Sequence, residues 1–439
     1  MDGMLDMTPD GNPTNADEGE SDRIRHSRSN GLLAMMVFLV ALNLRPSIVA
    51  VGPLLESLGR DLHWEESAQG LLGAVPLLAF AAMSSLVRFL AGRLGENATV
   101  LSALLGIAIG AVIRSAGGSA LVWIGTAIIG CAIAVGNVLV PAIVRRDFVR
   151  HVSVATAVSS GCITAGSATA SLTVAAMAEH WGGWRPALAF WAVPALVVAV
   201  LWGVRMVEKH HVNSLANADC SSSEAQGSAA DATSLKPARD ESNVVRPSIP
   251  LWRRPMTWWV TAFMGLQSAA FYTMSNWLPT IAGNAGFDMT ASSRQLFVFQ
   301  VIGVFAGLLI PRLMNERGNQ ITAALTASLP MVVAGLGWLL MPRLSMLWAV
   351  IGGCGQGAAL VVALALITMR GRTQAETVVL SGIAQSLGYL LASLGPSVFG
   401  FLAEHTSGLS VPLTFFTVLA SIQCVVSFRV GRSERGTVR

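Results

Sequence analysis

Charged residues are scarce in this 439-residue chain, because Asp, Glu, Lys and Arg together make up only 12% of it. Soluble domains carry about 25% charged residues, which keep their surfaces in water. Hydrophobic residues reach 53%, and the mean hydropathy is +0.59. This composition excludes an ordinary soluble enzyme and a disordered protein, and it indicates a protein embedded in a membrane.

Cysteine motifs are also missing. The chain has five cysteines, and none lies in a Cys-x-x-Cys pair or at a metal-binding spacing from a histidine. The sequence therefore indicates neither a disulfide framework nor a zinc site. It also lacks the phosphate-binding Gly-x4-Gly-Lys-[Ser/Thr] loop, so ATP is not expected to drive it directly. We expect no cofactor and no metal.

Acidic residues and histidines are absent from the middle of the apolar runs. The 25 acidic residues and the seven histidines all lie in tails, in connecting segments or near the ends of runs. This distribution argues against an aspartyl dyad, intramembrane metal hydrolysis or a His-based nucleophile, so we do not expect an enzyme. It also removes the usual carboxylate proton carriers from the bilayer centre.

Long apolar runs are what the sequence has in abundance. A membrane-spanning helix needs about 20 mostly apolar residues. Twelve runs qualify: 31–54, 67–88, 97–113, 119–144, 152–178, 186–204, 256–281, 292–311, 320–341, 345–369, 377–402 and 409–428. We therefore predict an all-α polytopic membrane protein with twelve transmembrane helices.

A polar stretch divides these runs six and six. Residues 207–250 are rich in Ser, Ala and charged residues, a composition that predicts a flexible linker. The predicted divisions are an N-terminal tail at 1–30, a six-helix bundle at 31–206, the linker, a second bundle at 251–428 and a C-terminal tail at 429–439.

The basic residues predict the orientation. Alternate connecting segments carry 23 of the 29 Lys and Arg residues on the side of the tails and the linker, against 5 on the other side, among them Arg114. Because cytoplasmic loops are enriched in Lys and Arg, both termini and the linker are predicted to be cytoplasmic. The same bias explains the net charge of +4 without a nucleic-acid partner.

The two halves of the chain repeat each other at an offset of 223–225 residues. Arg88-x4-Arg93 recurs as Arg312-x4-Arg317, and Ala178-Glu179-His180 recurs as Ala403-Glu404-His405. Gly130-Cys131 likewise recurs as Gly353-Cys354. These matches predict duplicated six-helix halves that face each other across a central cavity, as in many secondary transporters.

Arg45 is the one charged residue in the middle of an apolar run, within Asn43-Leu44-Arg45-Pro46. A mid-bilayer Arg costs roughly 2.5–3.5 kcal/mol on insertion scales. A cavity-facing Arg offers planar donors to an anion or a polar ring. The alternative is a structural Arg that neighbouring carbonyls and amides satisfy. We favour the first interpretation, because no acid lies in the membrane to pair with Arg45.

Uncharged polar residues extend this hypothesis. Tyr272 shares a helix face with Ser268 and lies near Gln267, while Tyr389 shares one with Gln385. Gln300, Gln356 and Asn137 also lie within runs, and hydrogen bonding between helices is the alternative role for all of these. A stripe of Ser160, Thr164, Ser167 and Ser171 is better explained by close helix packing.

Three segments carry a resemblance to a known family. They are Asn43-Leu44-Arg45-Pro46 with Val51-Gly52-Pro53-Leu54, Gly265-Leu266-Gln267-Ser268 with Tyr272 and Trp277-Leu278-Pro279, and Ala384-Gln385-Ser386-Leu387-Gly388-Tyr389 with Gly395-Pro396. The chain resembles the cyanate porter and 2-nitroimidazole transporter family of the major facilitator superfamily from about residue 31 to 428.

The resemblance implies two pseudo-symmetric six-helix bundles in a bacterial cytoplasmic (inner) membrane. It also implies a functional monomer that carries a small anion or a small polar heterocycle by alternating access. The candidate substrate-binding residues are Arg45, Asn43, Gln267, Tyr272, Trp277, Gln356, Gln385 and Tyr389.

The superfamily's gating-loop signature is degenerate here, because Gly92 replaces its Asp and Glu96-Asn97 replace its terminal basic pair. The candidate gating residues are Arg88, Arg93, Arg312 and Arg317.

Two alternatives remain at this point. A proton-coupled multidrug exporter of the same fold would normally need an embedded acid, although titration elsewhere, such as at Glu376, stays open. A membrane sensor would need a folded cytoplasmic domain, and 207–250 is too short and polar for one. The expected partners are a small solute and the lipid bilayer, with a proton gradient as a candidate driving force.

Overall fold

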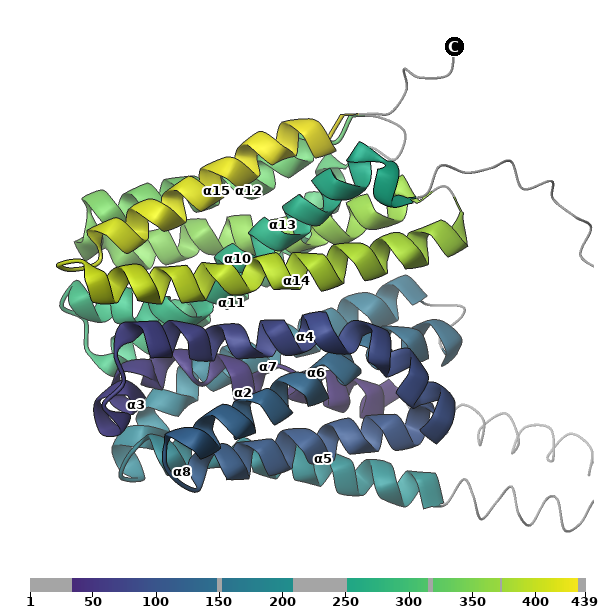
Figure 1. Ribbon diagram of the computed structural model, residues 1–439, viewed down its shortest axis with the longest axis horizontal. Helices are drawn as coiled ribbons and strands as arrows, with labels where there is room; N and C mark the ends of the chain where they lie inside the picture. Colours follow the sequence, from purple (N-terminus) through teal and green to yellow (C-terminus); the bar gives the residue numbers. More distant parts are fainter. Residues whose placement is uncertain (1–33, 148–151, 208–250, 315–318, 372, 433–439) are drawn as a thin grey trace, which may run out of the picture.

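The computed structural model describes residues 34–147, 152–207, 251–314, 319–371 and 373–432, and the regular elements in these ranges are all helices. The predicted linker and tails therefore lie outside the described residues, apart from residue 207 of the linker and residues 429–432 of the C-terminal tail. Figure 1 shows two groups of roughly parallel helices, with α2–α8 in the lower group and α10–α15 in the upper group. The prediction of an all-α membrane fold is confirmed.

The N-terminal half begins with a broken first span, Ala34–Leu62. It comprises a helix over 34–43, α2 (Pro46–Val49), the short 3-10 helix η1 (Gly52–Leu54) and α3 (Leu55–Leu62). The remaining helices are α4 (Glu66–Leu94), α5 (Glu96–Ser115), α6 (Ser119–Asp147), α7 (Val152–His180) and α8 (Trp184–Ala189), which a helix over 192–207 continues.

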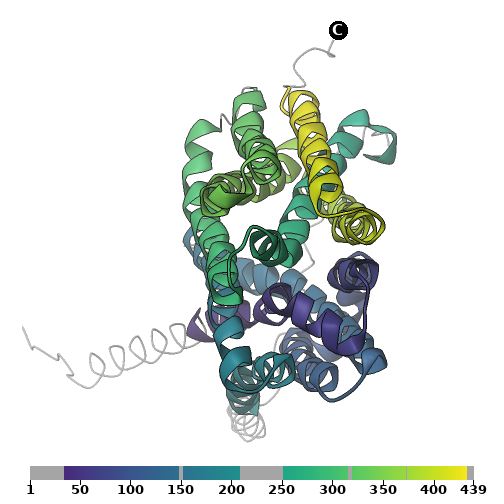
Figure 2. The same cartoon turned by 90° about the vertical axis from the view of Figure 1, so that its left-hand side faces the viewer.

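The C-terminal half comprises η2 (Leu251–Arg253), α10 (Pro255–Asn284), α11 (Met289–Leu309), η3 (Ile310–Leu313), α12 (Ile321–Leu340), η4 (Pro342–Leu344), α13 (Ser345–Arg370), α14 (Gln374–His405) and α15 (Ser410–Val430). In this half the first long helix, α10, is unbroken. Viewed along the helices in Figure 2, the two halves form separate groups that meet along one interface.

Eleven helical segments of the described chain are long and apolar enough to cross a membrane, and α10 is not among them. The helix α10 has the necessary length, at 30 residues, but it carries polar residues such as Gln267, Ser268 and Asn276. These side chains are buried, so α10 lies inside the protein rather than against lipid. The run predicted at 256–281 is thus a central helix whose polar side chains face other helices.

The helical hairpins define two ends of the molecule. At the linker end the described chain stops at Val207 and resumes at Leu251. At the other end, called the closed end below, lie the turns at 63–65 and 406–409. The two ends lie to the right and to the left of Figure 1.

The halves approach each other most tightly near the closed end. A Cβ on Gly52 would lie 2.1 Å from the backbone oxygen of Ser275 in α10, so no larger residue fits there without separating the two halves. Gly70 of α4 lies similarly against Pro396 and Gly400 of α14. These contacts close the interface between the halves at this end.

Candidate functional site

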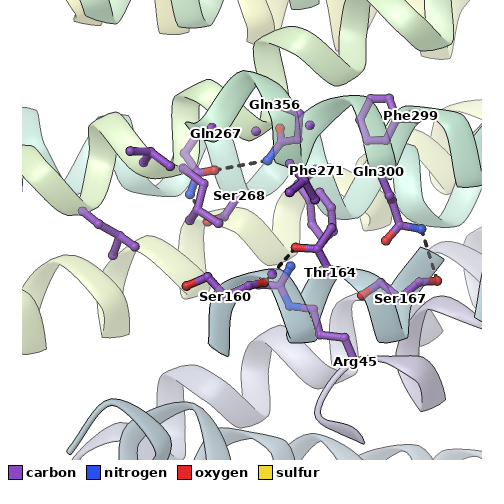
Figure 3. A pocket seen from close by; sticks show the side chains of 18 of the residues that line it. Arg45, Ser160, Thr164, Ser167, Gln267, Ser268, Phe271, Phe299, Gln300 and Gln356 are labelled. Atoms are coloured by element: carbon purple, nitrogen blue, oxygen red, sulfur yellow. Dashed lines mark hydrogen bonds between the residues drawn. The ribbon is translucent and has the colours of Figure 1, made fainter. Parts of the chain in front are cut away.

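A cavity of about 450 Å³ lies between the two halves. The N-terminal half contributes Arg45 and residues of α7, and the C-terminal half contributes residues of α10, α11, α13 and Tyr389 of α14 (Figure 3). The lining residues extend along α11 to Leu308 and along α13 to Leu364, in the second halves of both helices. The cavity therefore reaches from the middle of the bundle toward the linker end.

Arg45 enters this cavity from the break in the first span. Its guanidinium carbon lies 5.0 Å from the ring centre of Phe271 and 5.9 Å from that of Tyr272. Its Nε is buried and has no hydrogen-bond partner among the described residues. Among the described residues that line the cavity, Arg45 is the only charged one. The site thus presents one positive charge without a compensating acid.

Pro46 produces the break that places Arg45. Because proline has no N–H, the carbonyl of Leu42 loses its helical donor and the helix ends at residue 43. The helix α7 packs directly on this carbonyl: a Cβ on Gly166 would lie 2.0 Å from the Leu42 oxygen. Glycine at 166 is therefore required for α7 to pack against the break.

A second arginine, Arg114, hydrogen-bonds to the segment that follows this break. Arg114 was expected in a connecting segment, but it lies in the last turn of α5 and is fully buried. Its Nη1 donates a hydrogen bond of 2.6 Å to the carbonyl of Ser47. That carbonyl is available because the N–H of Val51 bonds to Ile48 instead. Sequence counting assigned Arg114 to a loop because it follows the last apolar residue of its run.

Two predicted amides meet at the wall of the cavity. Gln356 of α13 donates a hydrogen bond of 3.3 Å to the side-chain oxygen of Gln267 in α10. Gln267 in turn donates to Ser268, at 2.7 Å (Figure 3). Gln267 and Gln356 both line the cavity, so they combine hydrogen bonding between helices with a position on the cavity wall.

The two tyrosines also line the cavity. The ring of Phe80 in α4 contacts both in edge-to-face geometry, with centroid distances of 6.3 Å to Tyr272 and 5.3 Å to Tyr389. Edge-to-face pairs are a favourable arrangement of aromatic rings. This cluster joins the N-terminal half to α10 and α14 beside Arg45.

Three predicted solute residues lie elsewhere in the structure. Asn43 is buried and donates back to the carbonyl of Leu39, at 2.9 Å. Trp277 is fully buried against Phe399, with ring centroids 5.2 Å apart. Gln385 donates to Ser381 on its own helix, at 2.7 Å. None of the three is among the residues that line the cavity.

The predicted gating residues that the structure describes lie at the linker end. The helix α4 continues through the expected loop and ends only at Gly95, whose φ of 78° suits glycine. Arg93 is therefore helical and exposed, with its guanidinium 4.3 Å from the ring centre of Phe89. Arg312 is exposed in η3, while the side chain of Arg88 and all of Arg317 lie outside the described residues.

The structure divides the serine stripe of α7. Ser160, Thr164 and Ser167 line the cavity and Ser171 does not, although Ser167 is buried as deeply as Ser171. Close packing, the expected role of the stripe, therefore describes Ser171 better than the other three.

Gln300 of α11 is a cavity residue that was not among the predicted binding residues. Its amide nitrogen hydrogen-bonds across the two halves to the Ser171 hydroxyl, at 3.2 Å, and to the Ser167 carbonyl, at 3.4 Å. Its amide oxygen is buried without a partner among the described residues. Its position within an apolar run was visible in the sequence, but the direction of its side chain was not.

The comparisons with known proteins agree with this architecture. The family model described as Major Facilitator Superfamily matches residues 32–396. The chain is similar to the 2-nitroimidazole transporter of Escherichia coli (strain K12), with 30% identity over 91% of this chain and 95% of the relative. It is also similar to the cyanate transport protein CynX of the same organism, with 24% identity over 91% of this chain and 95% of that protein.

A solved structure has the same fold. The crystal structure of a D-xylose–proton symporter superposes with a TM-score of 0.70 at 14% identity, covering 92% of this chain and 98% of the other.

Proposed function

Because the chain belongs to the major facilitator superfamily and is a membrane carrier rather than an enzyme, we propose that it transports a small organic or inorganic anion or a small polar heterocycle. Arg45 is the proposed main contact with the solute. Gln267, Gln356, Tyr272 and Tyr389 complete the proposed binding site. The two relatives that carry 2-nitroimidazole and cyanate support this range of solutes.

The single observation that carries the proposal is the unpaired charge of Arg45 in the cavity. Arg45 is half-buried, and a solute that displaces water from its charge must itself supply a partner, because a desolvated charge is costly without one. An anionic solute supplies that partner, and a polar heterocycle supplies ring acceptors for the same donors. Water in the open cavity hydrates Arg45 when the solute leaves, and this replacement permits release.

The proposed orientation has both termini and the linker in the cytoplasm of a bacterial cell, with the protein in the inner membrane. The excess of Lys and Arg on the linker side supports it. In this orientation the cavity opens toward the cytoplasm, and the cross-half contacts seal the outer side. The described conformation is then inward-facing, one of the two states that alternating access requires.

Proton coupling by an embedded acid has less support. Glu376, the acid left open for proton antiport, hydrogen-bonds to Arg254 through both oxygens, at 3.0 and 3.1 Å. Both residues lie at the start of their helices, at the linker end and away from the cavity lining. We therefore propose a monomeric carrier whose solute site contains no acid, with multidrug antiport as the second candidate.

Solute counterflow in proteoliposomes tests this function. The preparations are loaded with cyanate or 2-nitroimidazole, and uptake of the labelled solute is measured for the wild type, Arg45→Ala, Arg45→Lys and the control Arg343→Ala. We expect Arg45→Ala to abolish counterflow and Arg45→Lys to weaken it, because lysine lacks the planar donor pair. Arg343 is exposed at the closed end, and its loss should leave counterflow unchanged. Normal counterflow by folded Arg45→Ala protein would refute the proposal.

A further inference from the structure

The size of the cavity limits the solute. Cavities that bind organic ligands have volumes of about 300–1,000 Å³, whereas one water occupies about 30 Å³ of liquid. At about 450 Å³, the cavity falls in the first range. A three-atom inorganic anion would fill little of this space and would leave most of the lining in contact with water.

The walls of the cavity are suited to a solute with an aromatic ring. Four aromatic rings line it: Phe271, Tyr272, Phe299 and Tyr389. Aliphatic side chains from α11 and α13 form another part of the lining: Val304, Leu308, Leu360, Val361 and Leu364. Rings pack favourably on other rings in offset or edge-to-face geometry, and apolar walls favour a ligand with apolar surface.

The two ends of such a solute meet different polar groups. Arg45 supplies the positive charge, from the N-terminal half. Gln300, from α11 of the C-terminal half, supplies a hydrogen-bond acceptor, because its amide nitrogen is already bound to α7 (Figure 3). Gln300 is only 3% exposed, and its oxygen has no partner among the described residues. A buried acceptor of this kind is satisfied by a donor from the ligand or from water.

We propose that the amide oxygen of Gln300 accepts a hydrogen bond from the solute, and that the solute is a planar aromatic monoanion. Such a solute carries its negative charge at one edge and an O–H or N–H at another. This inference rests on the proposed binding of the anionic group by Arg45. It names a narrower class than small anions in general, and it adds Gln300 as a specificity residue. The bonds from Gln300 to α7 place this contact at the interface that closes over the solute.

Calorimetry on the purified protein tests the solute class with matched probes. Benzoate supplies the charge and the ring, 3- and 4-hydroxybenzoate add a donor, and the corresponding methoxybenzoates replace that donor by a methyl ether. We expect at least one hydroxybenzoate to bind about tenfold more tightly than its methoxy analogue, because the latter leaves the Gln300 oxygen unpaired. Cyanate is measured beside them as the small anion.

Two variants test the role of Gln300. In Gln300→Met, which is similar in length but has no acceptor, the preference for the hydroxy compound should disappear while benzoate affinity remains within about threefold. Ser171→Ala is the matched control, because it removes the partner of the amide nitrogen and leaves the amide oxygen in place. It should keep the preference. Size-exclusion chromatography and circular dichroism verify that both variants are folded.

The outcomes separate this inference from the proposed function. Persistence of the hydroxyl preference in Gln300→Met, or equal affinity of hydroxy and methoxy compounds for the wild type, would overturn the role of Gln300. Binding of cyanate without binding of any benzoate, with loss of cyanate binding in Arg45→Gln, would overturn the solute class and leave the proposed function standing. Unchanged anion binding in Arg45→Gln would overturn both.

Discussion

The side chain of Glu404 accepts a hydrogen bond from the backbone N–H of Ser67, with 3.1 Å between nitrogen and oxygen. Glu404 lies in the last turn of α14 and Ser67 in the first turn of α4, so the bond joins the two halves at the closed end. Glu179, in the last turn of α7, makes the repeat-related contact: it accepts from the hydroxyl of Thr290, in the first turn of α11, at 3.1 Å.

The duplicated Ala-Glu-His segments thus form the same kind of contact twice. Each carboxylate lies near the N-terminus of a helix in the other half, where a negative charge interacts favourably with the helix dipole. Opening of the closed end requires both contacts to break. The repeat that identified the two halves in the sequence therefore also marks the residues that hold them together on this side.

The first prediction concerns the pH dependence of the closed end. A hydrogen bond with Glu404 and the negative charge of that residue raise the pKa of Glu65 above its usual value of 4.5. The charged and titratable groups around this contact are Glu66, Glu404 and His405. An acid whose pKa is higher in the closed state stabilises that state when protonated, and the contribution is lost as the pH rises through the raised pKa. We expect the fraction of molecules in which the halves are in contact at this end to fall as the pH rises above about 4.5.

Double electron–electron resonance measures the distance between two spin labels, here at Gly118 and Ser407, in a background without native cysteines. Both positions are exposed at this end, in opposite halves, so the distance distribution gives the fraction of closed molecules. Glu65→Gln, which cannot titrate, should flatten the pH response in this range. A response of wild-type size in Glu65→Gln would contradict the assignment of this pH dependence to Glu65.

Much of the fold was predictable because each membrane helix needs a long apolar run, and such runs are evident without any partner. The helix α10 shows where this signal weakens, since its buried polar residues lower its hydropathy without preventing a 30-residue helix. Arg45 was predictable for the same reason, because a charge within an apolar run is conspicuous.

The direction in which each side chain points was harder to predict from the sequence. Trp277 follows Gln267 on the same helix, yet it packs on Phe399 rather than lining the cavity. Gln300 is one of several amides within runs, and only its contact with α7 distinguishes it. These differences depend on the rotation of each helix and on the contacts between halves, neither of which the spacing of residues along one helix determines.

The second prediction concerns Gly52. An added Cβ would lie 2.1 Å from the backbone oxygen of Ser275, and backbone cannot move aside as a flexible side chain can. We expect Gly52→Ala to separate the halves at the closed end and to shift the protein toward the outward-facing state. The same pair of spin labels should report a longer distance. Gly203→Ala is the matched control, because this helical glycine has no heavy atom within 4 Å of an added Cβ. An unchanged distance in Gly52→Ala would contradict the steric argument.

The third prediction concerns Arg114, for which stability and function should separate. Two of its nitrogens, Nε and Nη2, are buried without partners among the described residues, while Nη1 holds the Ser47 carbonyl. A hydrogen bond from a charged group contributes about 1.5–3 kcal/mol. Burial of a charge costs several kcal/mol, so an apolar replacement is often neutral or stabilising. The bond to Ser47 nevertheless fixes the segment that begins with Arg45 and Pro46.

We therefore expect Arg114→Met to unfold at the same temperature as the wild type or at a higher one, and to bind the anionic solute about tenfold more weakly. The loss should appear in the dissociation constant, because the freed Ser47 carbonyl lets the break shift and moves Arg45 relative to Phe271 and Tyr272. Arg114→Lys, which keeps a donor able to reach toward that carbonyl, should recover part of the affinity. Thermal unfolding and calorimetry on the same preparations measure both quantities. A large fall in unfolding temperature with unchanged affinity would make Arg114 a structural residue alone, with no role in placing Arg45.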